Sequence, residues 1–130
     1  MNLLLDTHFV LWLLTGSPRL DSYGWLADRR PWGISPVSLL ELQYLAEIGR
    51  LDLLDATGLE ETLGQDVRFV IDEPPLLPLI RQALALSWTR DPFDRLLVAH
   101  SLTRRVALCT TDRTIRAHHK LVADELGGVT

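Results

Sequence analysis

Four acidic residues stand where apolar runs end or where apolar helix faces are expected. Asp6 follows three leucines in "LLLDTH", and Asp112 stands in "CTTDRT" just after another apolar run. Glu41 and Asp94 fall within two segments whose apolar residues have helical spacing. Carboxylate oxygens are the ligands that Mg²⁺ and Mn²⁺ prefer, and a metal held by them activates water for phosphodiester hydrolysis. The acids therefore indicate a candidate metal-dependent hydrolytic site.

Glu41 lies in the helix predicted to begin after Ser35 and to run to about Gly49. A carboxylate beside an apolar stripe costs free energy unless something compensates it. The alternative is that Glu41 lies at the margin of the stripe and reaches water. The stripe consists of Val37, Leu40, Tyr44 and Ile48, with Leu45 beside it.

Each of the other acids also has a structural explanation. Asp6 and Asp112 could cap the helices expected after them, and Asp91 before Pro92 is fully explained as an N-cap. Asp94 lies in the first helical turn, where the helix dipole favours an acid. Together, however, four converging carboxylates would repel one another and raise one another's pKa values, and a divalent cation would relieve that repulsion.

Short apolar segments alternate with helical ones, which predicts an α/β domain with a mainly parallel sheet. Ligands of such sheets bind beyond the carboxyl ends of the strands, so Asp6 and Asp112 are expected to face one crevice. Asp21 or Ser22 is expected to cap the second helix. The predicted strands are 2–5, 32–34, 67–71, 106–109 and 121–123, and the predicted helices are 7–14, 20–30, 36–49, 58–65, 76–88, 92–105 and 112–119.

The bulk properties fit one domain over residues 1–130, with 47% hydrophobic residues and no apolar run long enough for a membrane span. No signal peptide is recognisable, and the one cysteine, Cys109, is expected to be a buried thiol. We therefore expect a soluble, cytoplasmic protein.

The formal net charge of −4 disfavours a nucleic-acid partner at first sight. That charge equals the charge of the four acids, so metal binding would remove the main electrostatic obstacle to a phosphate substrate. Of the 13 basic residues all but Lys120 are arginine, which suits phosphate contacts but also follows from codon bias.

Four segments resemble, in order and spacing, the motifs of PIN-domain nucleases, and "DPFDRLLVA" is most similar to VapC-type toxins of toxin–antitoxin pairs. The resemblance implies a three-layer α/β/α sandwich and a Mg²⁺- or Mn²⁺-dependent endoribonuclease. It implies that the metal is held by Asp6, Glu41, Asp94 and Asp112. The segments are "LLLDTH", "SLLELQYL", "RDPFDRLLVAHSL" and "LCTTDRTI".

The resemblance further implies a homodimer and an antitoxin whose basic residue enters the acidic pocket. Asp91 is expected to be a cap first and an accessory residue second. Hydroxyl groups near the acids, which could equally be capping or surface groups, belong to Thr7, Ser38, Thr110 and Thr111. Candidates for steering the RNA backbone, which could equally be solvated helix residues, are Arg90, Arg95 and Arg113.

The histidines are not assigned to catalysis. His100 stands where many PIN relatives have glutamine and is expected at a core edge or an interface. His118 and His119 are expected on the surface, and helical geometry is expected to turn His8 away from Asp6.

Three other functions compete with RNA hydrolysis. A phosphoacceptor signalling domain also gathers acids at strand ends, but the position of Lys120 fits it poorly. A PIN-like module could act only by binding a partner protein. A metal-dependent DNase is chemically open, because nothing in the sequence reads a 2′-hydroxyl.

Overall fold

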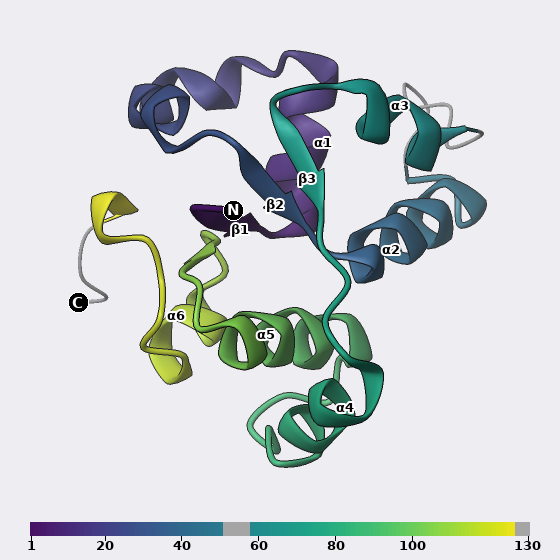
Figure 1. Cartoon of the computed structure of the whole chain (residues 1–130), viewed down its shortest axis with the longest axis vertical. Helices are drawn as coiled ribbons and strands as arrows, with labels where there is room; N and C mark the ends of the chain where they lie inside the picture. Colours follow the sequence, from purple (N-terminus) through teal and green to yellow (C-terminus); the bar gives the residue numbers. More distant parts are fainter. Residues whose placement is uncertain (51–57, 127–130) are drawn as a thin grey trace.

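A four-stranded parallel sheet lies at the centre of the molecule (Figure 1). The structure is a computed structural model that describes residues 1–50 and 58–126. The strand order is β3-β2-β1-β4, so the first strand pairs with both the second and the fourth. The strands are β1 (Leu3–Leu5), β2 (Trp32–Ile34), β3 (Phe69–Ile71) and β4 (Leu108–Cys109). The mainly parallel sheet expected from the sequence is thus confirmed.

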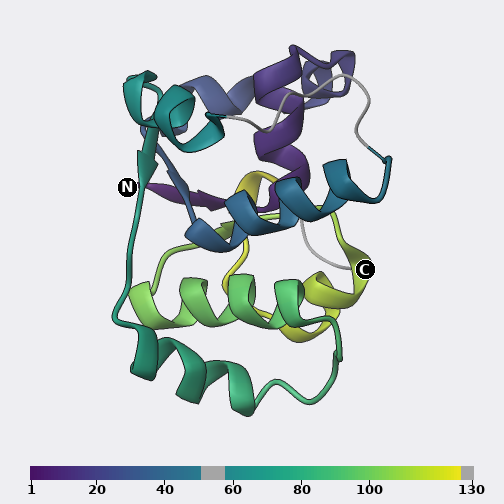
Figure 2. The same cartoon turned by 90° about the vertical axis from the view of Figure 1, so that its right-hand side faces the viewer.

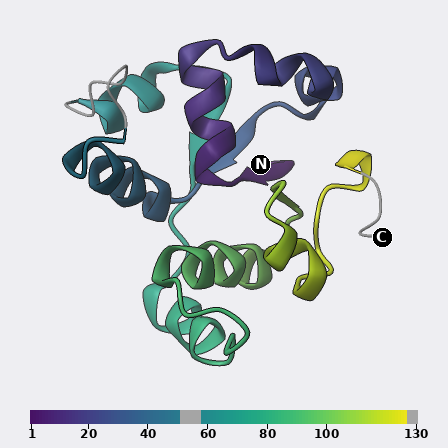
Figure 3. The same ribbon diagram turned by 180° about the vertical axis from the view of Figure 1, so that it is seen from behind.

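Helices cover both faces of this sheet (Figure 1 and, from behind, Figure 3). Leu3 and Leu5 pack in one apolar core with Phe9 of α1, whereas Leu4 points into a second core with Val98 of α5. This alternation is what a strand buried on both faces produces, and it gives the three layers of an α/β/α sandwich. The helices are α1 (Thr7–Thr15), η1 (Pro18–Arg29), α2 (Pro36–Glu47), α3 (Leu59–Gln65), α4 (Leu76–Leu84), α5 (Pro92–Arg104), α6 (Arg113–His118) and η2 (Asp124–Leu126).

The helix starts follow the local signals closely. Ser35 accepts a hydrogen bond from the Val37 amide at 3.2 Å, with Pro36 at the first helical position. Helix η1 differs from its prediction, because its cap is Ser17, whose hydroxyl accepts from the amide of Arg19. Ser17 precedes a proline in the same way as Ser35, which makes it the stronger cap signal.

Several element ends differ from the predicted ones. Helix α4 stops at Leu84 rather than residue 88, and α2 stops at Glu47, just before Gly49 with its positive φ of 77°. The expected strand 121–123 is reduced to a single parallel bridge between Val122 and Leu108. Element ends depend on long-range pairing and are the least local feature of a fold.

The burial of Cys109 and the length of the helices both bear on properties expected from the sequence. Cys109 is buried in β4, and burial raises the pKa of its thiol, which confirms an inert side chain. Among residues 1–50 and 58–126, no helix is long and apolar enough to cross a membrane.

The apolar stripe predicted on α2 faces the opposite way from expectation. Leu40, Tyr44 and Ile48 are 62%, 47% and 46% exposed, whereas Ser38 and Leu42 are buried. The inward face packs Leu42 and Leu39 into the main apolar core, and beside them the Ser38 hydroxyl hydrogen-bonds to Thr7 at the start of α1. The helix therefore presents apolar side chains to the solvent.

The expected surface position of the two adjacent histidines is right for only one of them. His118 is exposed, but His119 is buried and its Nε2 lies 2.9 Å from the Ser101 hydroxyl. His119 ends α6 at the point where the chain turns back toward the bridge at Val122, so its ring is enclosed by α5.

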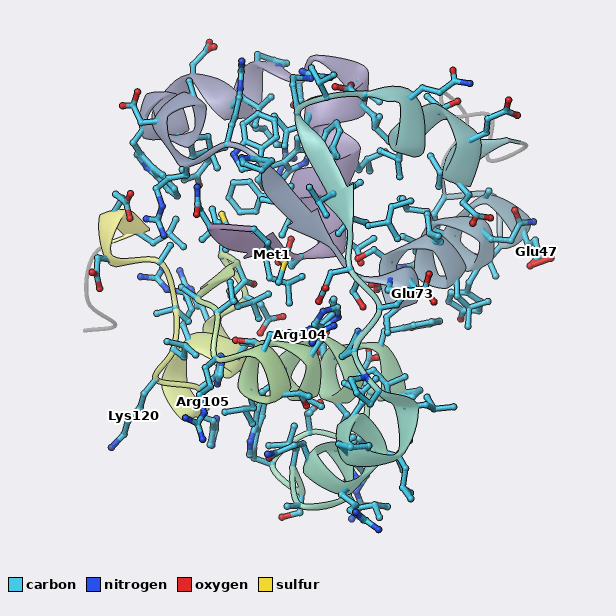
Figure 4. All side chains as sticks on the ribbon, viewed as in Figure 1. Met1, Glu47, Glu73, Arg104, Arg105 and Lys120 are labelled. Carbon is cyan, nitrogen blue, oxygen red and sulfur yellow. The ribbon has the colours of Figure 1, made fainter. Side chains whose placement is uncertain are left out.

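His100 is fully buried on α5 rather than at a core edge. Its Nε2 lies 2.7 Å from Asp72 Oδ2, an oxygen that also accepts from Arg104 Nε at 2.9 Å. Arg104 donates in addition to the carbonyl of Glu73 at 3.0 Å, and Figure 4 labels both residues where α5 meets the chain that leaves β3. The network therefore fastens α5 to the end of β3.

We expect His100→Leu to lower the free energy of unfolding by about 1–3 kcal/mol at pH 8, because Asp72 loses a buried donor. His100→Gln keeps a donor and should lose less. Burial lowers the pKa of His100, so the folded protein binds fewer protons than the unfolded chain below about pH 6.5 and loses stability there.

Urea unfolding at pH 8 and pH 5.5 measures both effects. The difference between the two pH values should shrink in both variants. Equal stability of wild type and His100→Leu at pH 8 would show that the network contributes nothing.

Candidate active site

The four acids singled out in the sequence line one pocket. It encloses about 30 Å³ between the start of α1, the middle of α2 and the first turns of α5 and α6. Figure 2 looks toward this region, with α2 in blue above α5 in green and α6 in yellow-green at the right-hand end of α5. The lining residues are Asp6, Thr7, His8, Glu41, Asp94, Leu97, Asp112 and Ile115.

Asp6 is held where β1 ends, at the junction of three elements. Its amide donates to the Cys109 carbonyl at 3.0 Å, and its Oδ1 accepts from the Phe9 amide at 3.1 Å. Burial raises the pKa of Asp6, while a hydrogen bond to the Thr110 side chain opposes that rise. The side chain is therefore both the N-cap of α1 and a fixed, buried member of the pocket.

The Glu41 carboxylate lines the pocket and is held by a chain of two hydroxyl groups. Thr7 Oγ1 donates to Glu41 Oε1 at 2.5 Å and lies 3.0 Å from Ser38 Oγ. Because Thr7 has a single hydroxyl proton, Ser38 donates to Thr7. Burial and the negative charges of Asp91 and Asp6 raise the pKa of Glu41, and the Thr7 bond opposes the rise.

The carboxyl group of Asp94 has a strongly raised pKa. Burial, followed by the negative charges of Asp91, Asp112, Glu41 and Asp6, raises its pKa to about 7. A carboxylic acid at pKa 7 is half protonated at neutral pH, which here reflects burial first and the negative charge of the neighbouring acids second. The helix dipole of α5 does not offset this charge.

Asp112 and Asp91 both cap helices, but only Asp112 lines the pocket. Asp112 Oδ1 accepts from the Ile115 amide at 2.9 Å, at the start of α6. Asp91 Oδ1 accepts from the amides of Phe93 and Asp94 at 2.8 and 3.3 Å, and it acts on the pocket through its charge. Capping and site membership thus coincide at Asp6 and Asp112.

The remaining candidates are spread around the pocket. Thr110 Oγ1 accepts from the Asp112 amide at 3.1 Å, whereas Thr111 is not among the described residues that line the pocket. Arg90 and Arg113 are exposed, and Arg95 Nε donates to the Thr89 carbonyl at 2.7 Å, which ties α5 to the preceding loop.

His8 was expected to turn away from Asp6, but it lines the same pocket. It lies in the first turn of α1, where the helix opens onto the strand ends, so its direction is set by the helix start rather than by the helical wheel. Its positive form lowers the pKa of both Asp6 and Glu41. The signal available in the sequence was its position two residues after a strand-end acid.

The arrangement of the side chains does not form a closed metal cage. Within residues 1–50 and 58–126, no three His, Cys, Asp or Glu side chains are arranged so that they could hold a metal ion as they stand. The donor set itself is all oxygen, and the open volume exceeds the roughly 10–15 Å³ that one water needs.

A family model identifies the fold around this pocket. The model of the PIN domain matches residues 3–121, which includes all four acids. The chain belongs to the PIN domain family. This PIN domain is 29% identical over 120 residues to ribonuclease VapC22 of Mycobacterium tuberculosis, and the match covers 90% of the chain and 92% of that protein. No solved structure matches this PIN domain.

Proposed function

We propose that this PIN domain is a VapC-type toxin, an endoribonuclease that depends on Mg²⁺ or Mn²⁺ and cuts RNA at the four-carboxylate pocket. One observation supports it above all: four acids from four separate elements meet in one pocket, where the pKa of Asp94 rises to about 7. Such a cluster is unfavourable by itself, which is the expected state of a site built for cations. The similarity to a ribonuclease over nearly the whole chain points the same way.

The donor chemistry of the pocket fits a hard divalent cation. Asp6, Glu41, Asp94 and Asp112, which all line the pocket, would hold it. The bound cation would activate water and stabilise the negative charge that develops on the phosphate.

The protein's own residues orient the carboxylates of the pocket and supply the positive charge that steers the RNA. The Asp6 carboxylate accepts hydrogen bonds from the Phe9 amide and the Thr110 side chain, and the Thr7 hydroxyl, in contact with Ser38, orients the Glu41 carboxylate. Water attacks phosphorus and the bond to the 3′-oxygen breaks, which leaves a 5′-phosphate and a 3′-hydroxyl. Arg90, Arg95 and Arg113, next to the acids in sequence, are proposed to steer the RNA backbone, and Asp91 and Thr111 are accessory residues.

The alternatives receive less support. Lys120, which a phosphoacceptor domain would need at its acids, lines a different pocket. A partner-binding module without catalysis would have no reason to keep four mutually repelling acids together. A DNase is the second candidate, because nothing in the sequence identifies a group that reads a 2′-hydroxyl, and a comparison of RNA with DNA as substrate distinguishes the two.

We expect purified protein, freed of any partner, to cut a mixed structured RNA with Mg²⁺ or Mn²⁺ and to stop when EDTA is added. Single-stranded DNA of the same sequence is the matched substrate control. Cleavage that persists in EDTA would contradict metal dependence, preference for DNA would favour the DNase, and a folded protein inactive with every metal would favour the binding module.

We also propose that the protein forms a homodimer and binds a cognate antitoxin. The exposed apolar side chains Leu40, Tyr44 and Ile48 on α2, with Leu76 and Leu77 on α4, support contact surfaces of this kind. Light scattering on the isolated chain should give twice the monomer mass, and Tyr44→Glu should reduce the mass to that of a monomer. A monomeric wild type would refute the homodimer.

A further inference from the structure

A second and larger pocket lies farther along α5 and α6, two of the helices that form the acidic one. It has a volume of about 310 Å³, within the roughly 300–1,000 Å³ typical of small-molecule sites. Its walls come from the loop between α4 and α5, the second half of α5 and the end of α6. The lining residues are Leu86, Trp88, Val98, Leu102, His118, His119, Lys120 and Leu121.

An aromatic platform forms one wall of this pocket. The rings of Trp88 and His118 stack with their centroids 4.8 Å apart and their planes only 5° from parallel. Beside them His119 is fixed by its contact with Ser101, whose own hydroxyl donates to the Val106 carbonyl at 2.6 Å. Because the two rings stack on each other, a further flat ring can stack only on an outer face of the pair.

The platform and the acids share their helices. On α6, Asp112 caps the first turn at the acidic pocket and His118 closes the last turn at the second pocket, a separation of about 9 Å along the axis. On α5, Leu97 lines the acidic pocket and Val98 and Leu102 line the second one. The two pockets therefore share α5 and α6 as walls.

One charged side chain lies among the described residues that line the second pocket. It is the ammonium group of Lys120. Lys120 is exposed at the rim, and Figure 4 shows it and Arg105 extending outward on the side where α5 ends. A cation at the rim suits a phosphate-linked ligand, whereas an apolar peptide would bring no negative charge to Lys120.

We propose that this pocket binds one nucleobase of the RNA substrate, from a nucleotide near the cleaved bond, with its ring against Trp88 and His118 and its phosphate toward Lys120. The proposal rests on the proposed RNase function and deepens it. Stacking on aromatic side chains is tolerant of base identity, so the pocket fixes the position of the strand more than its sequence.

The test uses an oligoribonucleotide cut at one mapped bond, and a set of copies that each carry a single abasic nucleotide. With the wild type, one abasic position near the cut should lower kcat/KM about ten-fold. Trp88→Leu and His118→Ala should lower kcat/KM about ten-fold on the intact RNA and lose nothing more on that abasic copy. Trp88→Phe should keep most of the activity.

Lys120→Ala should reduce the salt dependence of binding by about one charge, whereas Arg50→Ala, a remote control, should leave it unchanged. Wild-type rates in Trp88→Leu and His118→Ala, with unchanged melting temperatures, would overturn the proposal, as would losses that add fully to the abasic loss. If the wild type cuts no RNA, the proposed function fails by itself. Fluorescence anisotropy of the same RNAs then decides the pocket, and equal affinity of wild type and Trp88→Leu overturns it.

Discussion

Asp94→Asn is expected to lower kcat for RNA cleavage by about a thousand-fold, the scale seen when one group that stabilises transition-state charge is removed. Asparagine has nearly the shape of aspartate, but it lacks the charge that would hold the cation. The Asp94 carboxylate interacts with all the other acids, because the negative charges of Asp91, Asp112, Glu41 and Asp6 each raise its pKa.

The matched control for this experiment is Asp91→Asn, three residues earlier. Asp91 caps α5 without lining the acidic pocket, and asparagine caps a helix about as well as aspartate. We expect its cleavage rate to fall about ten-fold, far less than that of Asp94→Asn, because Asp91 acts on the pocket only through its charge. Cleavage measured with the same RNA and metal would reject the assignment if the two variants lost activity equally, or if Asp94→Asn kept wild-type activity.

The same substitution should stabilise the metal-free protein at alkaline pH. Because the pKa of Asp94 rises to about 7 in the folded state, the folded protein binds more protons than the unfolded chain between about pH 4 and pH 7. That stability is present at low pH and is lost as the pH rises through 7. Asp94→Asn removes the loss, so its free energy of unfolding in EDTA at pH 8 should exceed that of the wild type by about 1–2 kcal/mol.

Thermal unfolding at pH 5 and pH 8 tests this result. At pH 5, where the Asp94 carboxyl of the wild type is protonated, the two proteins should melt within a degree or two. Mn²⁺ at pH 8 should raise the melting temperature of the wild type and leave Asp94→Asn nearly unchanged. A variant that is less stable than the wild type at pH 8 would mean that the Asp94 charge is compensated without a metal.

The parts of the fold that could be predicted are those with a local cause. Ser35 followed by Pro36 and Asp91 followed by Pro92 fix the starts of α2 and α5, because a side-chain cap and a preset φ act within one turn. The orientation of α2 could not be predicted, because the helix has a second apolar face, with Leu39 and Leu42, and this face packs into the core beside the Ser38–Thr7 hydrogen bond. The burial of an apolar face is a tertiary outcome that periodicity alone does not decide.

The candidate site also has residues whose positions could be predicted from the sequence and residues whose positions could not. The placement of Asp6 and Asp112 at adjacent strand ends follows from a parallel sheet, whose strands all end at one edge. His8 was misplaced because a helical wheel describes the middle of a helix and not the turn that opens it. The burial of His119 and the platform at Trp88 depend on how the end of α6 closes against α5, and no short-range pattern encodes that closure.

The double use of Asp6 and Asp112, as helix caps and as members of the acidic pocket, constrains how this protein can change. Losing a cap costs about 1 kcal/mol, so alanine at either position damages the fold as well as the charge. Asparagine or serine would silence the pocket and leave the helix starts intact. A descendant that loses catalysis and keeps only binding should therefore carry asparagine or serine at these two positions, with both helix caps preserved.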